Sequence, residues 1–171
     1  LTLQQLQPDP ADAARVQSVD ALDCVRQAVD AFAYEDTGQR ARVQVCDEGN
    51  FRFQGDPMAV ELVLFNLLKN ALYYLPLHPS MTVTITVSAL PAPRIVVRDT
   101  GPGIAAELMP RLFEEFQTVG KAEGTGLGLA FCRRAMQLLG GGIECRSEPG
   151  RFTEFTLSFP QAAPQTPPAM P

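Results

Sequence analysis

The sequence predicts an α+β fold: a two-layer α/β sandwich in which a mixed, mainly antiparallel sheet is covered on one face by helices. Two observations lead to this class. Segments with alternating apolar residues, typical of half-buried strands, come in neighbouring pairs, and segments with apolar residues at helical spacing lie between these pairs. Strand and helix do not alternate throughout, as they would in a parallel α/β fold. The chain has 171 residues, 46% of them hydrophobic, which is enough for one substantial core.

The boundaries of the expected elements follow from the hydrophobic period and from residues that cap helices. Asp56 followed by Pro57 marks a helix start, because a carboxylate caps the first N–H groups and proline suits the first turn. Three consecutive glycines from Gly140 end the last helix. The expected elements are a helix over 20–34, strands over 42–46 and 51–53, a helix from 57 to about 76, strands over 81–90 and 94–98 that could form a hairpin, one or two short helices over 105–116, a helix over 127–139, and strands over 143–147 and 152–159.

One domain between two flanking segments is expected. Residues 1–17 are polar and contain proline, which is typical of a linker or of the end of a preceding dimerisation helix. Residues 161–171 are rich in proline and predict a disordered tail or linker. The predicted domain therefore covers residues 18–160. Because the chain starts without Met, we expect a piece of a longer protein.

The composition excludes several classes of function. The net charge is −5 and the pI about 4.9, which argues against nucleic-acid binding, since that needs a basic face. No run of about 18 apolar residues is present, so no direct membrane insertion is expected. The four cysteines form no CxxC pair and there is one histidine, so the pattern does not indicate a zinc site. The cysteines are expected to be reduced and mostly interior.

Asn66 and Asn70 form the first candidate site motif. They are four residues apart in the predicted helix, so they share one helix face. The amide of asparagine offers a neutral carbonyl oxygen, which is a suitable hard ligand for Mg²⁺. Taken alone, the pair also fits a polar edge on an amphipathic helix.

The second motif is the run Asp99-Thr100-Gly101-Pro102-Gly103, directly after a predicted strand. Glycines let the backbone pass close to a flat ligand. A carboxylate at the strand end can accept a hydrogen bond from the exocyclic amine of adenine, and guanine has no donor at that position. The same run also fits an ordinary Asp/Gly/Pro turn.

The third motif is a glycine-rich string at the start of the predicted helix over 127–139. Unpaired N–H groups at a helix start carry partial positive charge, and glycines let phosphate oxygens reach them. A flexible loop with a glycine-rich cap is the alternative. The residues of the string are Gly124, Thr125, Gly126, Leu127, Gly128 and Leu129.

The fourth motif is the segment LFEEF at 112–116, followed by a predicted mobile loop at 119–124. Its aromatic residues could anchor the base of a flap over a nucleotide. Lys121 lies within the flap, where its ammonium could meet the β- or γ-phosphate, although a solvated surface charge is also open.

Taken in order, these four motifs resemble the ATP-binding domain of histidine kinases, which belongs to the superfamily shared with gyrase, Hsp90 and MutL. The resemblance covers roughly residues 18–160. It implies a Bergerat-type sandwich with ATP held between helices and a mobile ATP lid, with Asn70 on Mg²⁺ and Asp99 on adenine. By the same resemblance, the pocket and phosphate site include Asn66, Gly101, Gly103, Gly124, Gly126 and Gly128, and Thr153 lies near the adenine with Asp99.

Two positions bear on the reaction type. The ATPase branches of the superfamily carry a glutamate that activates water four residues before the metal asparagine. Here that position is Asn66, which cannot act as a general base, so the resemblance implies phosphoryl transfer rather than hydrolysis. Many relatives carry a lysine where this chain has Tyr73, so one phosphate contact is lost or is supplied by Lys121.

The resemblance therefore implies the catalytic domain of a two-component sensor histidine kinase that binds Mg·ATP and transfers its γ-phosphate to a histidine. The implied partners are the histidine-containing dimerisation domain of the same parent protein and the receiver domain of a response regulator. The expected location is the cytoplasmic part of a bacterial membrane-bound sensor. His78 lies in a proline-flanked loop outside any acceptor motif, so the acceptor histidine is expected to be absent from this chain.

Three alternatives stay open at this stage. A degenerate nucleotide-sensing or protein-interaction module is favoured by Tyr73 and the short lid, and opposed by Asn70, Asp99 and the glycine string. An ATP-hydrolysing relative is disfavoured by Asn66. A serine kinase of the anti-sigma type shares the fold and is disfavoured by the linker-like N-terminus.

Overall fold

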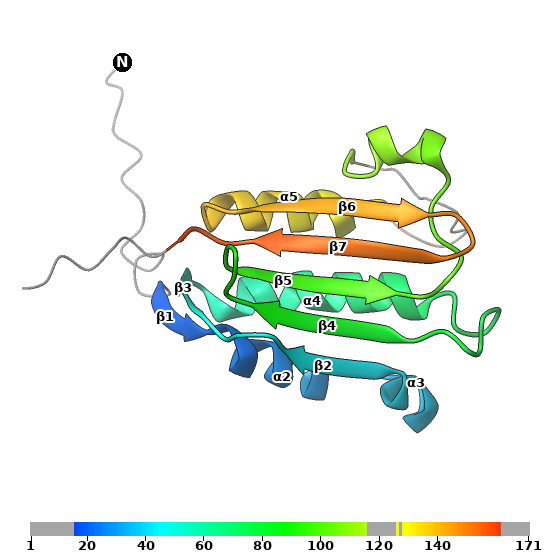
Figure 1. Cartoon of the computed structure of the whole chain (residues 1–171), viewed down its shortest axis with the longest axis horizontal. Helices are drawn as coiled ribbons and strands as arrows, with labels where there is room; N and C mark the ends of the chain where they lie inside the picture. The colour runs from blue at the N-terminus through cyan, green and yellow to red at the C-terminus, as the bar shows by residue number, and fades with distance from the viewer. Residues whose placement is uncertain (1–15, 116–125, 127, 162–171) are drawn as a thin grey trace, which may run out of the picture.

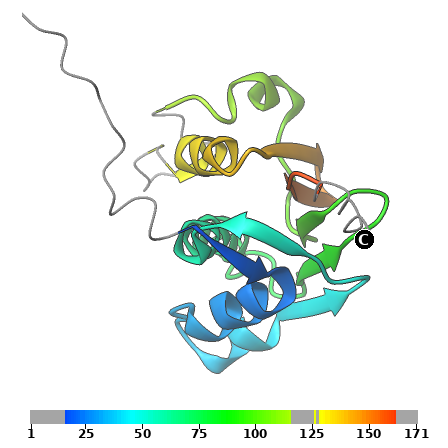
Figure 2. The ribbon, with the colours of Figure 1, turned by 90° about the vertical axis from the view of Figure 1, so that its left-hand side faces the viewer.

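The computed structural model describes residues 16–115, 126 and 128–161, and it has the predicted α+β architecture (Figure 1). A five-stranded sheet has the strand order β2-β4-β5-β7-β6, and a separate two-stranded sheet pairs β1 with β3. The helices α2, α4 and α5 cover one face of the large sheet (Figure 2). The predicted linker up to residue 15, the predicted lid loop at 119–124 and the predicted tail from residue 162 lie outside the described residues.

The elements agree with the predicted ones to within a few residues, except at three places discussed below. They are β1 Gln17–Asp20, α2 Ala21–Ala31, α3 Thr37–Ala41, β2 Val43–Asp47, β3 Arg52–Gly55, α4 Pro57–Leu72, β4 Val83–Ser88, β5 Arg94–Asp99, the 3₁₀ helix η1 Ala106–Arg111, α5 Gly128–Leu138, β6 Gly142–Glu148 and β7 Phe152–Ser158.

Helix α4 is the central element of the helical layer. The Asp56 side chain accepts a hydrogen bond from Met58 N at 2.9 Å and caps the helix, as the sequence predicts. Its apolar face is almost fully buried, with Leu64, Leu67 and Leu68 each at most 1% exposed. Helix α4 packs against α2, α5 and β4, so it connects both flanking helices to the sheet.

Strands β4 and β5 form the predicted hairpin, with Val83 opposite Asp99 and Ser88 opposite Arg94. Strand β7 pairs antiparallel with both β5 and β6. Strand β2 pairs parallel with β4, and this one parallel pair makes the sheet mixed. Alternating residues of β4, β5 and β7 are buried beneath the helices, as expected for strands with one covered face.

Three local predictions were wrong. Residues 17–20 form strand β1, although the sequence predicts a linker up to residue 17 and a helix from residue 20; only Val19 is buried, so β1 has no visible alternation. Residues 37–41 form the short helix α3, which has too few apolar residues to show a period. The helix expected over 105–116 is a 3₁₀ helix at 106–111 that contains Pro110, which cannot donate a helical hydrogen bond.

All four cysteines are free, as the sequence predicts. Burial raises the pKa of the Cys24 thiol to about 11 and that of Cys132 to about 12, so both are neutral at physiological pH. Among the described residues, no helix is both long and apolar enough to cross a bilayer.

The central position of α4 generates a stability prediction. Leu64→Ala should lower the free energy of unfolding by about 2–5 kcal/mol, because it leaves a cavity where α4 meets the sheet. Leu62→Ala, on the exposed side of the same helix, is the matched control and should cost about 1 kcal/mol or less. Urea denaturation of both variants measures the difference. Equal losses would contradict the proposed burial of this face.

Candidate functional site

The predicted site residues converge on one end of the sheet. The tip of β5, the C-terminal end of α4 and the helix η1 lie at the right-hand end in Figure 1. Helix α5 packs antiparallel to α4. Cys132 Sγ, within α5, lies 3.8 Å from Val63 O, within α4. Leu139, just after the C-terminal end of α5, lies next to Gly55, just before the N-terminal end of α4. The first described residue of α5 therefore lies at the same end as the tip of β5.

The structure brings Asn66 and Gly128 together. A Cβ built on Gly128 would lie 2.6 Å from Asn66 Oδ1, so only glycine lets the start of α5 approach this amide without displacing it. Asn66 Nδ2 donates to Leu62 O at 2.8 Å, and this bond leaves Oδ1 directed toward α5. Asn70 follows one turn later on the same face of α4 and is half-buried. Asn66 and Asn70 therefore lie on the face of α4 that is next to the start of α5.

Asp99 ends β5 as a buried carboxylate that is 7% exposed. Its Oδ1 accepts a hydrogen bond from Gly101 N at 2.9 Å. A Cβ on Gly101 would lie 2.8 Å from this oxygen and 3.2 Å from Met81 Cε, so glycine is needed for this turn. Thr153 lies directly opposite Asp99 in the β5–β7 pair and is also buried. Thr153 therefore lies beside Asp99, and the contact of both residues with adenine stays a prediction.

Tyr74 belongs to this neighbourhood and was missed in the sequence. Burial raises the pKa of its phenol above the usual value, and the neighbouring Tyr73 and the carboxylate of Asp99 raise it further. The phenol of Tyr74 therefore lies within electrostatic range of Asp99. The rings of Tyr73 and Tyr74 meet edge to face, with centroids 5.1 Å apart. Tyr74 follows Asn70 by four residues, so extending the helix face that carries the two asparagines would have found it.

Ser147 was also missed, and it fixes the loop that follows Asp99. Its Oγ accepts a hydrogen bond from Ile104 N at 2.7 Å and donates to Phe152 O at 2.8 Å. Gly150 N donates to Pro102 O at 2.7 Å, so the turn between β6 and β7 holds the loop at two points. No motif marks this serine, because its bond to the loop joins residues 43 positions apart in the sequence.

Gly103 lies against the turn between β6 and β7. Its φ is +70°, a left-handed conformation that favours glycine. A Cβ there would collide with the backbone of Glu148 and Pro149, so Gly103 allows the close approach of the β6–β7 turn. A contact between Gly103 and a ligand stays a prediction.

The structure describes some of the remaining predicted residues and not others. Tyr73 is 42% exposed at the end of α4, and Gly126 has a φ of +67°, which suits a hinge. Phe113, from the predicted aromatic motif, packs edge to face on Phe155 with centroids 6.3 Å apart. Lys121, Gly124, Thr125 and Leu127 lie outside the described residues.

The residues present fit an adenine nucleotide with a divalent cation. The carboxylate of Asp99 is an acceptor for an amine, and the buried side chain of Met81 packs against the Gly101 turn beside it, which makes this end of the site apolar. The amides of Asn66 and Asn70 are hard oxygen donors at the start of α5, where backbone N–H groups attract phosphate. The donor set is thus complementary to a base at one end and to phosphates at the other.

Comparison with known proteins gives the same assignment. The sequence profile of the family described as "Histidine kinase-, DNA gyrase B-, and HSP90-like ATPase" matches residues 55–163. The chain is 37% identical over 161 residues to the CAI-1 autoinducer sensor kinase/phosphatase CqsS of Vibrio cholerae, covering 94% of this chain and 23% of that protein. It is 36% identical over 137 residues to the autoinducer 1 sensor kinase/phosphatase LuxN of Vibrio campbellii, covering 80% of this chain and 16% of that protein. The chain therefore spans less than a quarter of the length of these relatives.

Solved structures share the fold. The ATP-binding domain of PrrB from Mycobacterium tuberculosis superposes with a TM-score of 0.65 at 22% identity, covering 87% of this chain and 99% of that one. Full-length ShkA, solved in complex with AMPPNP, superposes with a TM-score of 0.65 at 26% identity, covering 86% of this chain and 32% of that one.

The contact between Asn66 and Gly128 generates a prediction whose sign depends on the background. Gly128→Ala should lower the free energy of unfolding by about 1–3 kcal/mol, because the new methyl group displaces the Asn66 amide or shifts α5. In an Asn66→Ala background the same change should be neutral or stabilising, since alanine is the better helix former. Urea denaturation of the four variants measures the coupling. The same loss in both backgrounds would show that the two residues are not in contact.

Proposed function

Because the chain belongs to the family of histidine kinase-, DNA gyrase B- and HSP90-like ATPases and is an ATP-binding domain of the sensor-kinase type, we propose that it binds Mg·ATP and positions the γ-phosphate for transfer to a histidine on another domain. The fragment thus acts as the catalytic domain of a two-component sensor histidine kinase. A histidine-bearing domain of the parent protein and the receiver domain of a response regulator are the proposed partners, and the cytoplasm is the proposed location.

One observation carries the proposal: one face of α4 connects the start of α5 to the buried carboxylate of Asp99. Asn66 contacts Gly128 at one end of this face, and Tyr74 lies near Asp99 at the other. Asn70 lies between them, one turn from Asn66. A nucleotide bound along this face would place its base at Asp99 and its phosphates at the start of α5.

The chain's own residues would have the following roles in binding the nucleotide. Asp99 accepts a hydrogen bond from the exocyclic amine of adenine, while its Oδ1 is held in place by Gly101 N. The half-buried ring of Tyr74 provides apolar surface for the base, and the buried side chain of Met81 supports the Gly101 turn beside it. Asn70 supplies one oxygen to Mg²⁺, which usually completes its shell with phosphate and water and neutralises charge during transfer.

Asn66 favours transfer over hydrolysis. Its amide is neutral and is anchored to Leu62 O, so it cannot remove a proton from water. Phosphoryl transfer depends mainly on positioning and on charge neutralisation, and an anchored amide next to the phosphates is compatible with both.

The acceptor histidine is proposed to come from outside this chain. His78 lies in an exposed loop after α4, where its backbone N–H is bonded to Tyr74 O, and this loop differs from the helix expected of an acceptor. An exposed apolar surface on α4 and α5 supports docking of a helical domain. It consists of Met58 (59% exposed), Leu62 (43%), Phe131 (40%) and Leu138 (80%), which the antiparallel packing of the two helices aligns.

The binding proposal is tested with Asp99→Asn. ATP should bind with preference over GTP, and the variant should bind ATP about 10- to 100-fold more weakly, because the amide NH₂ faces the amine of adenine and a charge-assisted hydrogen bond worth about 1.5–3 kcal/mol is lost. Asn keeps an oxygen for Gly101 N, so the fold should survive. Calorimetric titration of ATP, ADP and GTP, with and without Mg²⁺, measures the effect.

The control for this titration is Asp47→Asn, the same chemical change on an exposed carboxylate of β2, which should leave ATP affinity unchanged. GTP binding as tightly as ATP, or equal losses in the two variants, would contradict the role of Asp99. No binding of any nucleotide at millimolar concentration would favour the non-catalytic module instead.

The docking surface gives a second test. Phe131→Asp should reduce phosphate transfer from ATP to an added histidine-bearing domain of the parent protein at least about tenfold, because a charge enters an apolar contact. Its ATP affinity should not change. Leu90→Asp, an exposed apolar residue beyond the end of β4, is the control and should transfer normally. Loss of transfer in both variants, or in neither, would place docking elsewhere.

A further inference from the structure

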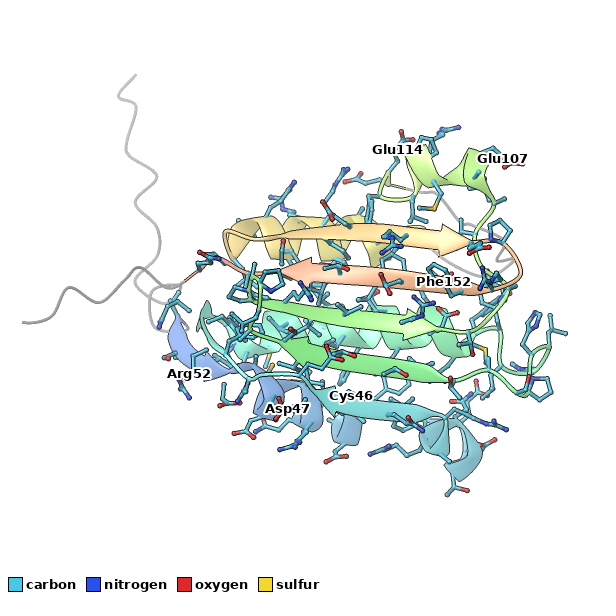
Figure 3. The ribbon with its side chains drawn as sticks, in the orientation of Figure 1. Cys46, Asp47, Arg52, Glu107, Glu114 and Phe152 are labelled. Atoms are coloured by element: carbon cyan, nitrogen blue, oxygen red, sulfur yellow. The ribbon has the colours of Figure 1, made fainter. Side chains whose placement is uncertain are left out.

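Strand β2 forms an edge of the five-stranded sheet, and no described strand pairs with its outer side. Helices α2 and α3 contact β2, as α5 and η1 contact β6, but none of these helices supplies a strand to pair with the edge. Figure 3 shows Cys46 and Asp47 of β2 on the outermost strand. Edge strands are usually protected by proline, lysine or a bulge, and the sequence of β2, VQVCD, contains neither proline nor lysine.

The hydrogen bonds of β2 show which backbone groups face outward. Arg42 O accepts from Val83 N at 2.9 Å, and Glu48 N donates to Val87 O at 2.9 Å, so the even-numbered residues face β4. The N–H and C=O groups of the odd-numbered residues therefore point away from the sheet. Arg40 Nη1 donates to Val43 O at 3.2 Å, which occupies one of these groups. In the described part of the chain, the N–H and C=O of Val45 have no hydrogen-bond partner.

A groove of about 530 Å³ runs beside this edge. Arg26, Val29 and Asp30 of α2 form one wall, and Val43 and Val45 of β2 form the other. The groove is therefore on the side of the sheet that the helices cover, where every second side chain of an added strand would point.

The charges of the groove distinguish its two ends. At one end Arg40 pairs with Asp30 at 3.3 Å. Arg26, one turn earlier on α2, forms no ion pair with any described residue. Arg26 lines the same groove as Val45. The groove thus offers an uncommitted guanidinium to an acidic side chain.

We propose that the outer edge of β2 binds an extended, acidic segment of a partner protein, which adds as a further strand next to Val45 and directs a carboxylate to Arg26. Backbone hydrogen bonds to Val45 give such a segment its register, and side chains in the groove give it selectivity. This surface is distinct from the nucleotide site and from the apolar surface on α4 and α5.

The direct probe is the peptide Thr-Val-Thr-Glu-Thr-Val-Thr, titrated into the ¹⁵N-labelled chain. Its Val, Glu and Val side chains share one side of a strand, and the palindrome fits either direction of pairing. The amide resonances of Val43, Val45 and Asp47 should shift, and the Val45 amide should become protected from hydrogen exchange. The same peptide with Lys in place of Glu should bind at least about tenfold more weakly. Shifts confined to other residues, or none at millimolar peptide, would overturn the proposal.

Two variants test the two contacts separately. Val45→Pro removes an outward N–H and no ladder hydrogen bond, so the chain should fold and lose peptide binding at least about tenfold. Gln44→Pro, whose N–H faces β4, should instead disrupt the sheet, and spectra of both variants check this difference. Arg26→Glu should lose the Glu peptide and gain the Lys peptide. Failure of this exchange would overturn the role of Arg26.

A peptide N-methylated at its central residues provides a test independent of variant folding, and it should not bind. A second copy of the chain is the competing occupant of the edge. Sedimentation of the chain alone should show no self-association through the edge of β2. If the chain does associate and Val45→Pro abolishes this association, the edge serves pairing between copies and the proposal is wrong.

Discussion

The burial of one face of α4 is the constraint on which the rest of the structure depends. Leu64, Leu67 and Leu68 are held between the sheet and the flanking helices, so α4 can neither rotate nor slide without opening the core. Because side chains four residues apart share a helix face, burying the leucines determines where Asn66 and Asn70 point. The apolar side of α4 thus sets the orientation of the polar side that is proposed to meet the phosphates.

The register of the sheet sets the position of Asp99, the residue proposed to bind the base. Pairing of β5 with β7 places Thr153 opposite Asp99, and the turn between β6 and β7 holds the following loop through Ser147. The proposed adenine acceptor is therefore held by strands, and the loop after it is held by hydrogen bonds from β6 and from the turn that follows β6. Such preorganisation lowers the cost of ordering the site on binding.

Three surfaces of the domain can be distinguished, and two of them adjoin, because Leu62 of the apolar surface lies one turn from Asn66 on the same face of α4. The nucleotide site lies at one end of the sheet, the apolar surface lies on the outer side of α4 and α5, and the bare edge lies along β2. Each offers a different kind of contact: charge and flat apolar surface, apolar packing, and backbone hydrogen bonding. The apolar surface would bring a helical acceptor next to the proposed phosphate site, while the edge of β2 would leave both free for a nucleotide and an acceptor.

The amino-acid sequence by itself determined the elements whose signals are local. The cap at Asp56, the alternation in β4 and β5, and the spacing of Asn66, Asn70 and Asp99 were all readable, because each depends on neighbours within a few residues. Only the tertiary structure decided the pairing of β1 with β3, the parallel pairing of β2 with β4, and the approach of Tyr74 and Ser147 to the site. These contacts join residues whose separation along the chain carries no periodic signal, and they form only when burial of the common core brings their elements together.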